Sequence, residues 1–551
     1  MKFPGYIHLF CLRTLAPLRL FNFHRKGIKT IIVLFLLPQI YFAVQQDSSE
    51  VTSNKIPLIN LSGLAVAELG NKKIYADEFL NSYEFGPAFV KRENNSKKRF
   101  LEFMIYEKML ALEGYKKNLD KSPDVQLYLN DIVDDLASEQ MYRETIWDKV
   151  IIDSETVSKA VEKELIELEI SWIYKPTKSE IEEQYYSLKK RIPFDSLFYG
   201  QFNDSVTYDS RHMKSTRFKL EKTNPTLAVI IDSVKIGSPS LPIKTVDGWY
   251  IVRVDNLWKN LISTETQNNE LRYSLEEYLR KQKADSLSDA FVNKLILDNQ
   301  STIVRTTFNK LAVYVGKKIL PPAKFDEWNL VINIQDKNFN LSKIENSYQD
   351  LLVRTNSVGF TIKDFIGWYT NREPYIRFNL ISPQAFYNSL QSVVWRMVRD
   401  KLLGNIAKEK GYNKKPEIEK QKLWWKDKLV YSKMKLEIAG SVKLSDEQVK
   451  KYYNENLKKY VDENGRAKQF DDIKKDVWND YYVYAYTKKV VNKILSLKEK
   501  YHIKINDEAL NSLIVLDENN PRTIEIYSLK KSGTIVRPVY PSIDYEWQFW
   551  N

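Results

Sequence analysis

VKIGSPSLPIKTVDGWYIVRV, residues Val234–Val254, closes a segment that begins near residue 165. The alternation of residue types predicts a strand at Leu168–Tyr174 (LEISWIY) at the start of this segment. Thr177 and Glu180 have the spacing of a capping box, so a helix is expected from there through Lys190. The whole segment therefore predicts strand, helix, loop, short helix and strand, the order of a small α/β module.

The closing stretch resembles the end of the parvulin family of peptidyl-prolyl isomerases. Domains of that family end in a pattern like L-K-x-G-x-x-S-x-P-hydrophobic-x-T-x-x-G-aromatic-His. The residues here that fit it and its continuation are Lys235, Gly237, Pro242, Thr245, Gly248, Trp249, Ile251 and Val254. Phe194–Leu197 (FDSL) is similar to the family's F-x-x-L after the first helix. The resemblance covers about 90 residues and implies a parvulin-like module over residues 166–258.

The chain departs from the family at the positions of its two histidines. The matching positions hold Trp172 in the first strand and Tyr250 in the last. The glycine-rich loop of the family is replaced by Asn203–Ser215, which contains no glycine, and His212 within it is expected to be a plain surface side chain. The resemblance therefore implies a degenerate module, to which we assign no catalytic residue.

Loss of the histidines does not remove the means to bind a peptide. Prolyl isomerisation needs no nucleophile, because the enzyme lowers a barrier of about 18 to 20 kcal/mol by binding the twisted amide. An apolar pocket without the polar network retains affinity for extended peptides. The residues predicted to line or underlie this pocket are Trp172, Phe194, Leu227, Trp249 and Tyr250. For Phe194 and Trp172, packing in the core of the module is an equally good interpretation.

An internal repeat organises the rest of the chain. At a constant offset, residues 108–141 match residues 401–434 without a gap. Each copy predicts a helix, a proline and a second helix, at about 97–116 and 123–147 and again at about 386–411 and 416–440. The identities include Lys108/Lys401, Leu110/Leu403, Pro123/Pro416, Asp134/Asp427 and Met141/Met434, and Glu107/Asp400 match in charge. The alternative is that any helical protein repeats this order.

The segments that precede the copies also correspond to one another. A hairpin-like turn at Gly70-Asn71 is followed by Asp77-Glu78-Phe79, and Phe360–Phe365 (FTIKDF) has the same character before the second copy. The repeat is similar to the amino-terminal domain of SurA- and PpiD-type periplasmic chaperones, which wraps around an inserted parvulin module. The resemblance implies an α+β, mainly helical fold of two chaperone-like lobes, 60–165 with 259–320 and 321–551, with the module in the first.

The amino terminus predicts export. Arg25–Lys29 is basic and Ile31–Val44 is apolar, which is the pattern of a secretory signal and is short for a membrane span. Residues 1–46 are therefore expected to be a signal peptide or an uncleaved anchor in the inner membrane. The single cysteine, Cys11, lies within this leader, so no mature disulfide or thiol chemistry is expected. The predicted location is the periplasm.

Composition and motifs exclude several classes of function. The formal net charge is +13, but the leader contributes six basic residues, and the remaining charges are interspersed. No phosphate-binding loop, dinucleotide fingerprint or metal-spaced His/Cys cluster is present, so no cofactor and no metal are expected. No basic stripe or RNA-binding motif indicates a nucleic acid partner. Peripheral attachment to an anionic membrane surface stays open.

The resemblance to these chaperones, together with the absence of a nucleotide-binding motif, implies an ATP-independent chaperone that holds unfolded exported polypeptides, in particular precursors of outer-membrane proteins. Aromatic residues make up 13% of the chain and offer many weak contacts to unfolded strands. Two alternatives stay open: an active parvulin-type isomerase that tolerates Trp172 and Tyr250, and a dedicated assembly factor for one envelope complex. The aromatic carboxyl-terminal tail, Val536–Asn551, is expected to pack back on the body.

Overall fold

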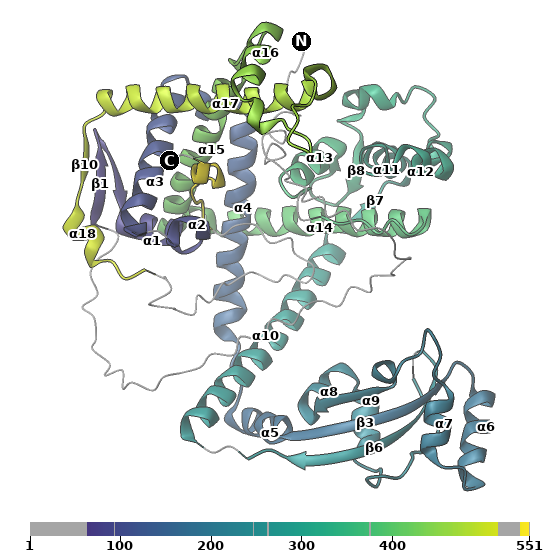
Figure 1. Ribbon diagram of the computed structural model, residues 1–551. Coiled ribbons are helices and arrows are strands. Elements are labelled where there is room, and N and C mark those ends of the chain that lie inside the picture. Colours follow the sequence, from purple (N-terminus) through teal and green to yellow (C-terminus); the bar gives the residue numbers. More distant parts are fainter. Residues whose placement is uncertain are drawn as a thin grey trace. The chain divides into compact units, whose positions relative to one another are not determined.

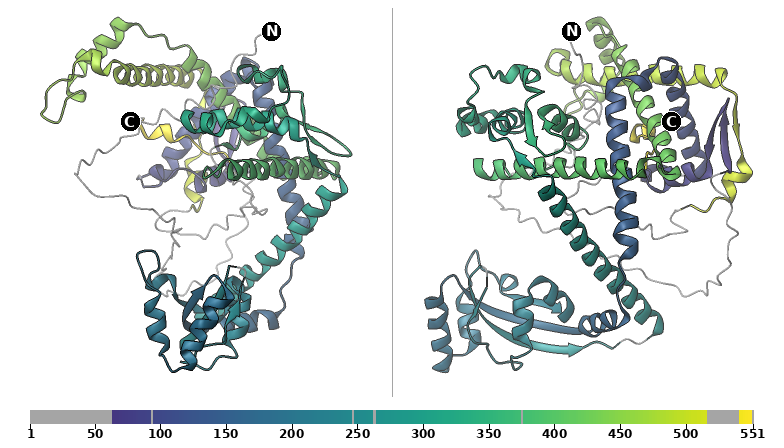
Figure 2. Two further views of the ribbon diagram at one scale, coloured as in Figure 1. Left: turned by 90° about the vertical axis from the view of Figure 1, so that its right-hand side faces the viewer. Right: turned by 180° about the vertical axis from the view of Figure 1, so that it is seen from behind.

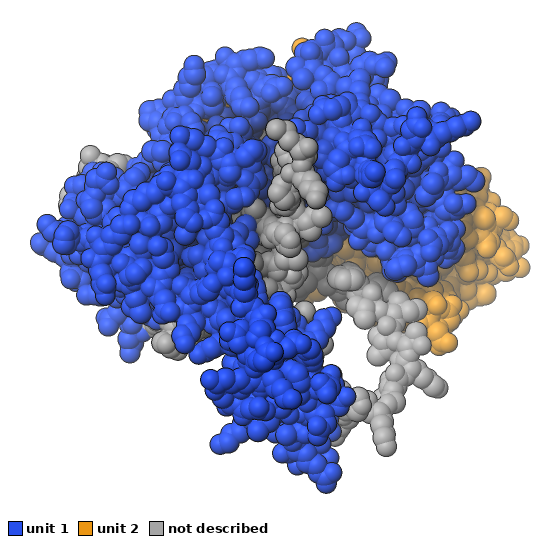
Figure 3. All heavy atoms as spheres, turned by 90° about the horizontal axis from the view of Figure 1, so that it is seen from above, with its two compact units in different colours: residues 1–138, 300–529, 534–551 blue, residues 139–299, 530–533 orange. Residues whose placement is uncertain are grey.

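The computed structural model describes residues 63–92, 94–245, 247–261, 264–373, 376–515 and 540–549 (Figure 1). The predicted leader, residues 1–46, lies outside them. The chain divides into two compact units (Figure 3). Unit 2 takes residues 139–299, and the other described residues belong to unit 1. In the described part of the chain, no helix has the length and apolar character needed to cross a membrane.

Unit 1 is mainly helical, with two small antiparallel sheets. Its first part runs through β1 (Ala65–Leu69), β2 (Lys72–Tyr75), α1 (Ala76–Glu84), α2 (Ala88–Lys91), α3 (Ser96–Lys116) and the start of α4 (Pro123–Thr145). After unit 2 come β7 (Thr302–Ile303), α11 (Arg305–Ile319), α12 (Pro322–Trp328), β8 (Leu351–Arg354), β9 (Phe360–Thr361), α13 (Ile362–Thr370), α14 (Pro383–Glu409), α15 (Pro416–Gly440), α16 (Asp446–Glu455), α17 (Phe470–Lys500), β10 (Ile503–Ile505) and α18 (Asp507–Ser512). The predicted fold class, mainly helical α+β, is confirmed.

The two copies of the repeat exchange strands. The hairpin β1–β2 of the first copy pairs with β10, which follows the long helix of the second copy (Figure 2). Likewise, strands β8 and β9 of the second copy form a sheet with β7, which belongs to residues 259–320, the predicted closing part of the first lobe. Ala67 lies opposite Ile505 in one sheet, and Thr302 lies opposite Arg354 in the other. Each sheet is therefore built from both copies.

The helices follow the same exchange. In the first contact, α3 packs on α15 so closely that a Cβ added at Gly114 would lie 2.6 Å from Val430 Cγ1. In the second, α14 lies against α4, where a Cβ at Gly404 would lie 3.0 Å from the Asp134 side chain. The first helix of each copy thus packs on the second helix of the other, and the glycines permit the close approach.

One core joins the segments that the sequence assigned to different lobes. Buried side chains of β1, β2, α1 and α3 form one hydrophobic cluster with those of α15, α17 and α18. The described part of the tail, residues 540–549, joins this cluster through Ile543 and Trp547, so this part packs back on the body as predicted. The lobe boundaries near 165, 258 and 320 stay predictions, but the shared core links the stability of the two copies.

Glu113 connects α3 to the end of α17. Its Oε1 lies 2.9 Å from Nζ of both Lys116 and Lys500 and accepts a hydrogen bond from the Tyr501 hydroxyl at 2.9 Å. Burial by itself would raise the pKa of Glu113, but the hydrogen bonds from Lys116, Lys500 and Tyr501 outweigh it and lower the pKa to about 2. The carboxylate therefore stabilises the folded state at neutral pH.

This linkage predicts a loss of stability in acid. Because the folded pKa lies below the ordinary value of 4.5, the contribution is complete above pH 4.5 and disappears as the pH falls towards 2. We expect a contribution of about 1 kcal/mol, since the lysines are half exposed and screened. Urea unfolding between pH 6 and pH 2 measures it. Glu113→Gln should remove this part of the pH dependence, and an unchanged difference between pH 6 and pH 2 would contradict the assignment.

Unit 2 contains a four-stranded antiparallel sheet in the order β4-β3-β6-β5. Its strands are β3 (Ile166–Lys175), β4 (His212–Thr216), β5 (Ile243–Lys244) and β6 (Trp249–Lys259). Helices α6 (Lys178–Lys189) and α7 (Phe194–Gly200) cover one face, and α8 (Arg217–Thr223) and α9 (Pro225–Ile231) cover the other. Two further helices, α5 (Ser154–Glu164) and α10 (Glu265–Asp298), pack on each other in the same unit.

Candidate peptide-binding site

The central strand pair of unit 2 places the two aromatic residues that stand at the histidine positions. Trp172 of β3 lies opposite Val252 of β6, and Tyr174 lies opposite Tyr250. Successive side chains of a strand point to opposite faces, so the register sends Trp172 and Tyr250 to the same face. There both pack against the cluster that contains Val252 and residues of α8 and α9.

Three of the five predicted site residues meet on this face. Leu227 of α9 packs against the same cluster as Trp172 and Tyr250, and all three are partly exposed. The position of Leu227 is fixed by the start of its helix, where its backbone N–H donates to Asn224 Oδ1 at 3.0 Å. We call Trp172, Leu227 and Tyr250 the aromatic face.

The other two predicted residues lie on the opposite face of the sheet. Phe194 and Trp249 pack with Ile173, Ile251 and the helices α6 and α7. Phe194 is only 6% exposed, and the Arg253 guanidinium lies over its ring at 4.4 Å. One peptide on the aromatic face would therefore not contact Phe194 or Trp249. Their role in peptide binding stays a prediction: Phe194 lies in the core of the module, and Trp249 is partly exposed and packs against that core.

The polar groups beside the aromatic face are bonded to one another. The Tyr250 hydroxyl donates to Asp247 Oδ2 at 2.6 Å, and the Tyr174 hydroxyl donates to the Asp247 carbonyl at 2.8 Å. Thr245 Oγ1 donates to Asp247 Oδ1 at 2.5 Å. Burial and the bond to Asp247 raise the pKa of Tyr250 to about 12, so the phenol is neutral at physiological pH. Tyr250 therefore does not change its charge near neutral pH.

Gly248 makes the turn into β6 possible. A Cβ at this position would lie 2.5 Å from Tyr174 Cε2 and 2.9 Å from the Lys175 carbonyl oxygen. No side chain fits there without displacing Tyr174, which itself packs edge to face on Tyr250 with ring centroids 5.1 Å apart. The glycine thus sets the geometry of the aromatic face.

Gly248→Ala is expected to lower the free energy of unfolding of unit 2 by about 1 to 3 kcal/mol, because the new methyl group overpacks the turn. Gly200→Ala is the matched control, since a Cβ there meets nothing within 4 Å. Thermal unfolding followed by circular dichroism compares the two variants. Equal melting temperatures for both would contradict the close approach at Gly248.

A polar cluster at the edge of the sheet was not predicted. His212 begins β4, its Nε2 lies 3.1 Å from Glu169 Oε1, and its ring stacks on Tyr208 with centroids 4.5 Å apart. Asn256 Nδ2 donates to Glu169 Oε2 at 2.6 Å, and this bond together with His212 lowers the pKa of Glu169. The His212 side chain is 13% exposed, so the prediction of a plain surface histidine in a loop was wrong. The strand escaped notice because HMKST has no apolar alternation.

Among the described residues, no group of three His, Cys, Asp or Glu side chains is placed to hold a metal ion.

Comparisons with known proteins give similarities to solved structures only. No protein-family model and no curated protein matches the chain. The peptidylprolyl isomerase PrsA from Bacillus anthracis is 16% identical, with 34% of this chain and 94% of that chain covered and a TM-score of 0.21. PrsA from Bacillus cereus is 14% identical, with coverages of 40% and 88% and a TM-score of 0.20. A structure reported under the heading of SurA-like chaperones in Campylobacter jejuni is 17% identical, with coverages of 42% and 97% and a TM-score of 0.20. The chain is thus similar, over less than half of its length, to PrsA structures and to a SurA-like chaperone structure, the kind of protein that its sequence resembles.

Proposed function

We propose that this protein is an ATP-independent extracytoplasmic chaperone that holds unfolded exported polypeptides, with outer-membrane protein precursors among its clients. Its parvulin-like module binds peptide segments and does not isomerise them. The observation that carries the proposal is the aromatic face. There Trp172 and Tyr250, which occupy the positions of the family's two histidines, pack beside Leu227.

The chemistry of this face favours binding over catalysis. Partly exposed aromatic and aliphatic side chains bind the apolar side chains of an unfolded segment without regard to its exact sequence. Catalysis would require groups that bind the twisted amide more tightly than the planar one. The Tyr250 hydroxyl is already engaged by Asp247, so it does not supply a free polar group for that purpose.

Exposed apolar side chains elsewhere on unit 2 support a holding function. Each exposed apolar side chain offers a weak contact to an unfolded segment, and several weak contacts on one chain add up to useful avidity. The most exposed of them in unit 2 are Ile151, Val229, Leu241, Leu261 and Leu297.

An aggregation assay tests the proposal. A β-barrel outer-membrane protein is diluted from urea with and without the full chain, and light scattering follows its aggregation in the absence of ATP. We expect suppression near equimolar ratios. Val229→Asp with Leu241→Asp should raise the amount needed several-fold, because each adds a charge to an exposed apolar position, 72% and 68% exposed.

The matched control places the same change on unit 1. Ile332→Asp with Ile381→Asp alters residues that are 75% and 86% exposed and should leave suppression unchanged. No suppression by the unaltered chain would overturn the holding function. Suppression that is equal for a soluble unfolded protein would overturn only the preference for outer-membrane clients.

A further inference from the structure

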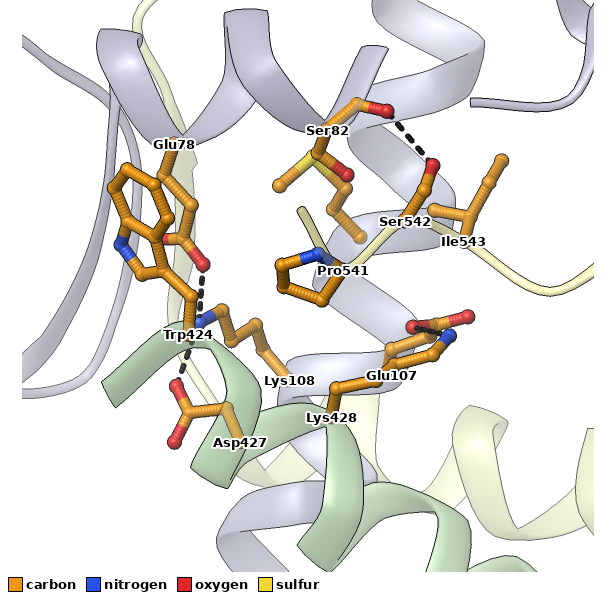
Figure 4. A pocket seen from close by; sticks show the side chains of 11 residues that line it. Glu78, Ser82, Glu107, Lys108, Trp424, Asp427, Lys428, Pro541, Ser542 and Ile543 are labelled. Atoms are coloured by element: carbon orange, nitrogen blue, oxygen red, sulfur yellow. Dashed lines mark hydrogen bonds and ion pairs between the residues drawn. The ribbon is translucent and has the colours of Figure 1, made fainter. Parts of the chain in front are cut away.

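The carboxyl-terminal segment of the described chain lies in a groove of unit 1 between α1, α3 and α15. Figure 4 shows Pro541 and Ser542 lying between Ser82 of α1 and Lys428 of α15. Ser542 Oγ donates to the Ser82 carbonyl at 2.7 Å. We call residues 541–547 the strap.

Polar anchors hold the middle of the strap. The Asp544 carboxylate contacts Lys428 Nζ at 2.8 Å and Lys435 Nζ at 2.5 Å, and it accepts a hydrogen bond from the Tyr431 hydroxyl at 2.9 Å. The backbone N–H of Asp544 donates to Glu107 Oε1 at 2.8 Å. Glu107 and Lys435 are themselves buried. Two lysines and a hydroxyl thus form a carboxylate-binding site that the strap fills.

An aromatic anchor follows three residues later. The Trp547 ring stacks on Phe103 with centroids 5.3 Å apart, and its Nε1 donates to Glu107 Oε1 at 2.8 Å. Trp547 is 3% exposed. Unit 1 therefore binds the strap at two of its side chains, the carboxylate of Asp544 and the indole of Trp547 three residues later. Each of the two makes a charge-assisted bond.

The second copy of the repeat fills the same place with its own side chains. Helices α1 and α13 have the same length, and their N-caps are Tyr75 and Thr361, so Trp368 corresponds to Ser82. Trp368 Nε1 donates at 3.1 Å to Asp400, the residue that matches Glu107 in the repeat. Both copies thus present a buried acid to an indole N–H, but only the first takes the indole from the strap.

Small residues leave the groove open in the first copy. Beyond the helix end, Gly86 corresponds to Arg372, and a Cβ at Gly86 would lie 2.8 Å from Ser542 Oγ. Ser82 and Gly86 therefore provide the space that Trp368 and Arg372 fill in the other copy. A cavity of about 40 Å³ remains beside Pro541 and Ile543, so the strap does not fill the groove completely.

We propose that this groove is a peptide-binding site and that the strap is a tethered ligand that an unfolded client replaces. The client segment that fits carries a carboxylate three residues before a tryptophan and turns between them, as the strap does at the start of its 3-10 helix Tyr545–Phe549. The proposal rests on the proposed function only in taking the partner to be an unfolded polypeptide, and it names the class of segment that this second site selects.

The tether sets the conditions for detection. A segment linked to its own site competes at an effective concentration on the order of millimolar, so a free peptide at micromolar concentration cannot displace it measurably. The anchors must therefore be weakened within the full chain. Asp544→Asn with Trp547→Ala removes both, and Lys428 still keeps Glu107 as its ion-pair partner at 2.7 Å.

The experiment measures binding of a fluorescent peptide with the sequence of residues 540–549, YPSIDYEWQF, by anisotropy. We expect the double variant to bind it at least tenfold more tightly than the unaltered chain. A peptide with the same two substitutions should bind at least tenfold more weakly to the double variant. Tyr545→Ala, at a 66% exposed position of the same segment, is the matched control and should behave as the unaltered chain.

Adding Ser82→Trp to the double variant should abolish peptide binding, because it supplies the side chain that fills the second copy; circular dichroism checks that this variant folds. If it does not fold, the comparison of the two peptides on the double variant decides.

Equal binding of the two peptides, or no binding by the double variant, would overturn the proposal. Continued aggregation suppression by that variant would leave the proposed function intact. Peptide binding without suppression would overturn the proposed function and support the groove.

Discussion

Arg372→Met is expected to lower the free energy of unfolding of unit 1 by about 3 to 5 kcal/mol, because it removes the buried guanidinium that pairs with the buried Asp131 carboxylate and with Asp135. Arg372 is 4% exposed. Its Nη1 lies 2.6 Å from Asp131 Oδ2, and its Nη2 lies 2.9 Å from Asp135 Oδ2. Burial alone would lower the pKa of Arg372, but these carboxylates raise it, so the guanidinium stays charged.

Urea denaturation followed by circular dichroism measures this loss. Arg354→Met, at an exposed position of β8, is the matched control and should change the free energy of unfolding by less than about 0.5 kcal/mol. A loss below about 1 kcal/mol for Arg372→Met would mean that α13 and α4 do not depend on this ion cluster.

Phe100→Ala should lower the free energy of unfolding by about 3 to 5 kcal/mol, since it opens a cavity in the shared core. Phe100 is fully buried and packs edge to face on Phe79 and Tyr83, with centroids 5.9 Å and 5.1 Å apart. Because α3 shares its core with α17, the loss should extend to the second copy.

Hydrogen exchange measured by mass spectrometry separates a local effect from a shared one. In Phe100→Ala, exchange should accelerate in residues 470–500 as well as in residues 96–116. Phe89→Ala is the control, since Phe89 is only partly buried at the margin of the cluster and should have a smaller effect. Acceleration confined to residues 96–116 would contradict the exchange of elements between the copies.

The helices could be predicted closely from the sequence. The helix expected at 416–440 is α15, and those expected at 97–116 and 386–411 are α3 and α14 within three residues at each end. Apolar spacing and the prolines at the helix starts determine these boundaries locally. Successive side chains of β6 alternate between the faces of the sheet, so Tyr250 and Trp249 lie on opposite faces, although both were predicted to line one pocket.

The exchange between the copies could not be predicted. Lys108 pairs with Asp427 at 2.6 Å, and both residues have counterparts in the other copy, Lys401 and Asp134. Because each copy has both a lysine and an aspartate at these positions, the sequence is compatible with an ion pair within one copy and with an ion pair between copies. Only the folded structure shows which of the two ion pairs forms. The sequence did carry a signal for the strap groove, because Trp368 and Arg372 of the second copy are replaced by Ser82 and Gly86 in the first. That signal can be interpreted only once the structure shows that Trp368 donates to Asp400, the counterpart of Glu107.

Two-dimensional exchange NMR on a proline-containing peptide tests the central claim most directly, because it reports binding and isomerisation together. Uncatalysed cis–trans exchange takes tens to hundreds of seconds, so mixing times below a second show cross-peaks only if the protein catalyses it. We predict that adding the full chain shifts and broadens the peptide signals while no cis–trans cross-peaks appear. Cross-peaks at substoichiometric protein would contradict the account and identify unit 2 as a working isomerase despite Trp172 and Tyr250.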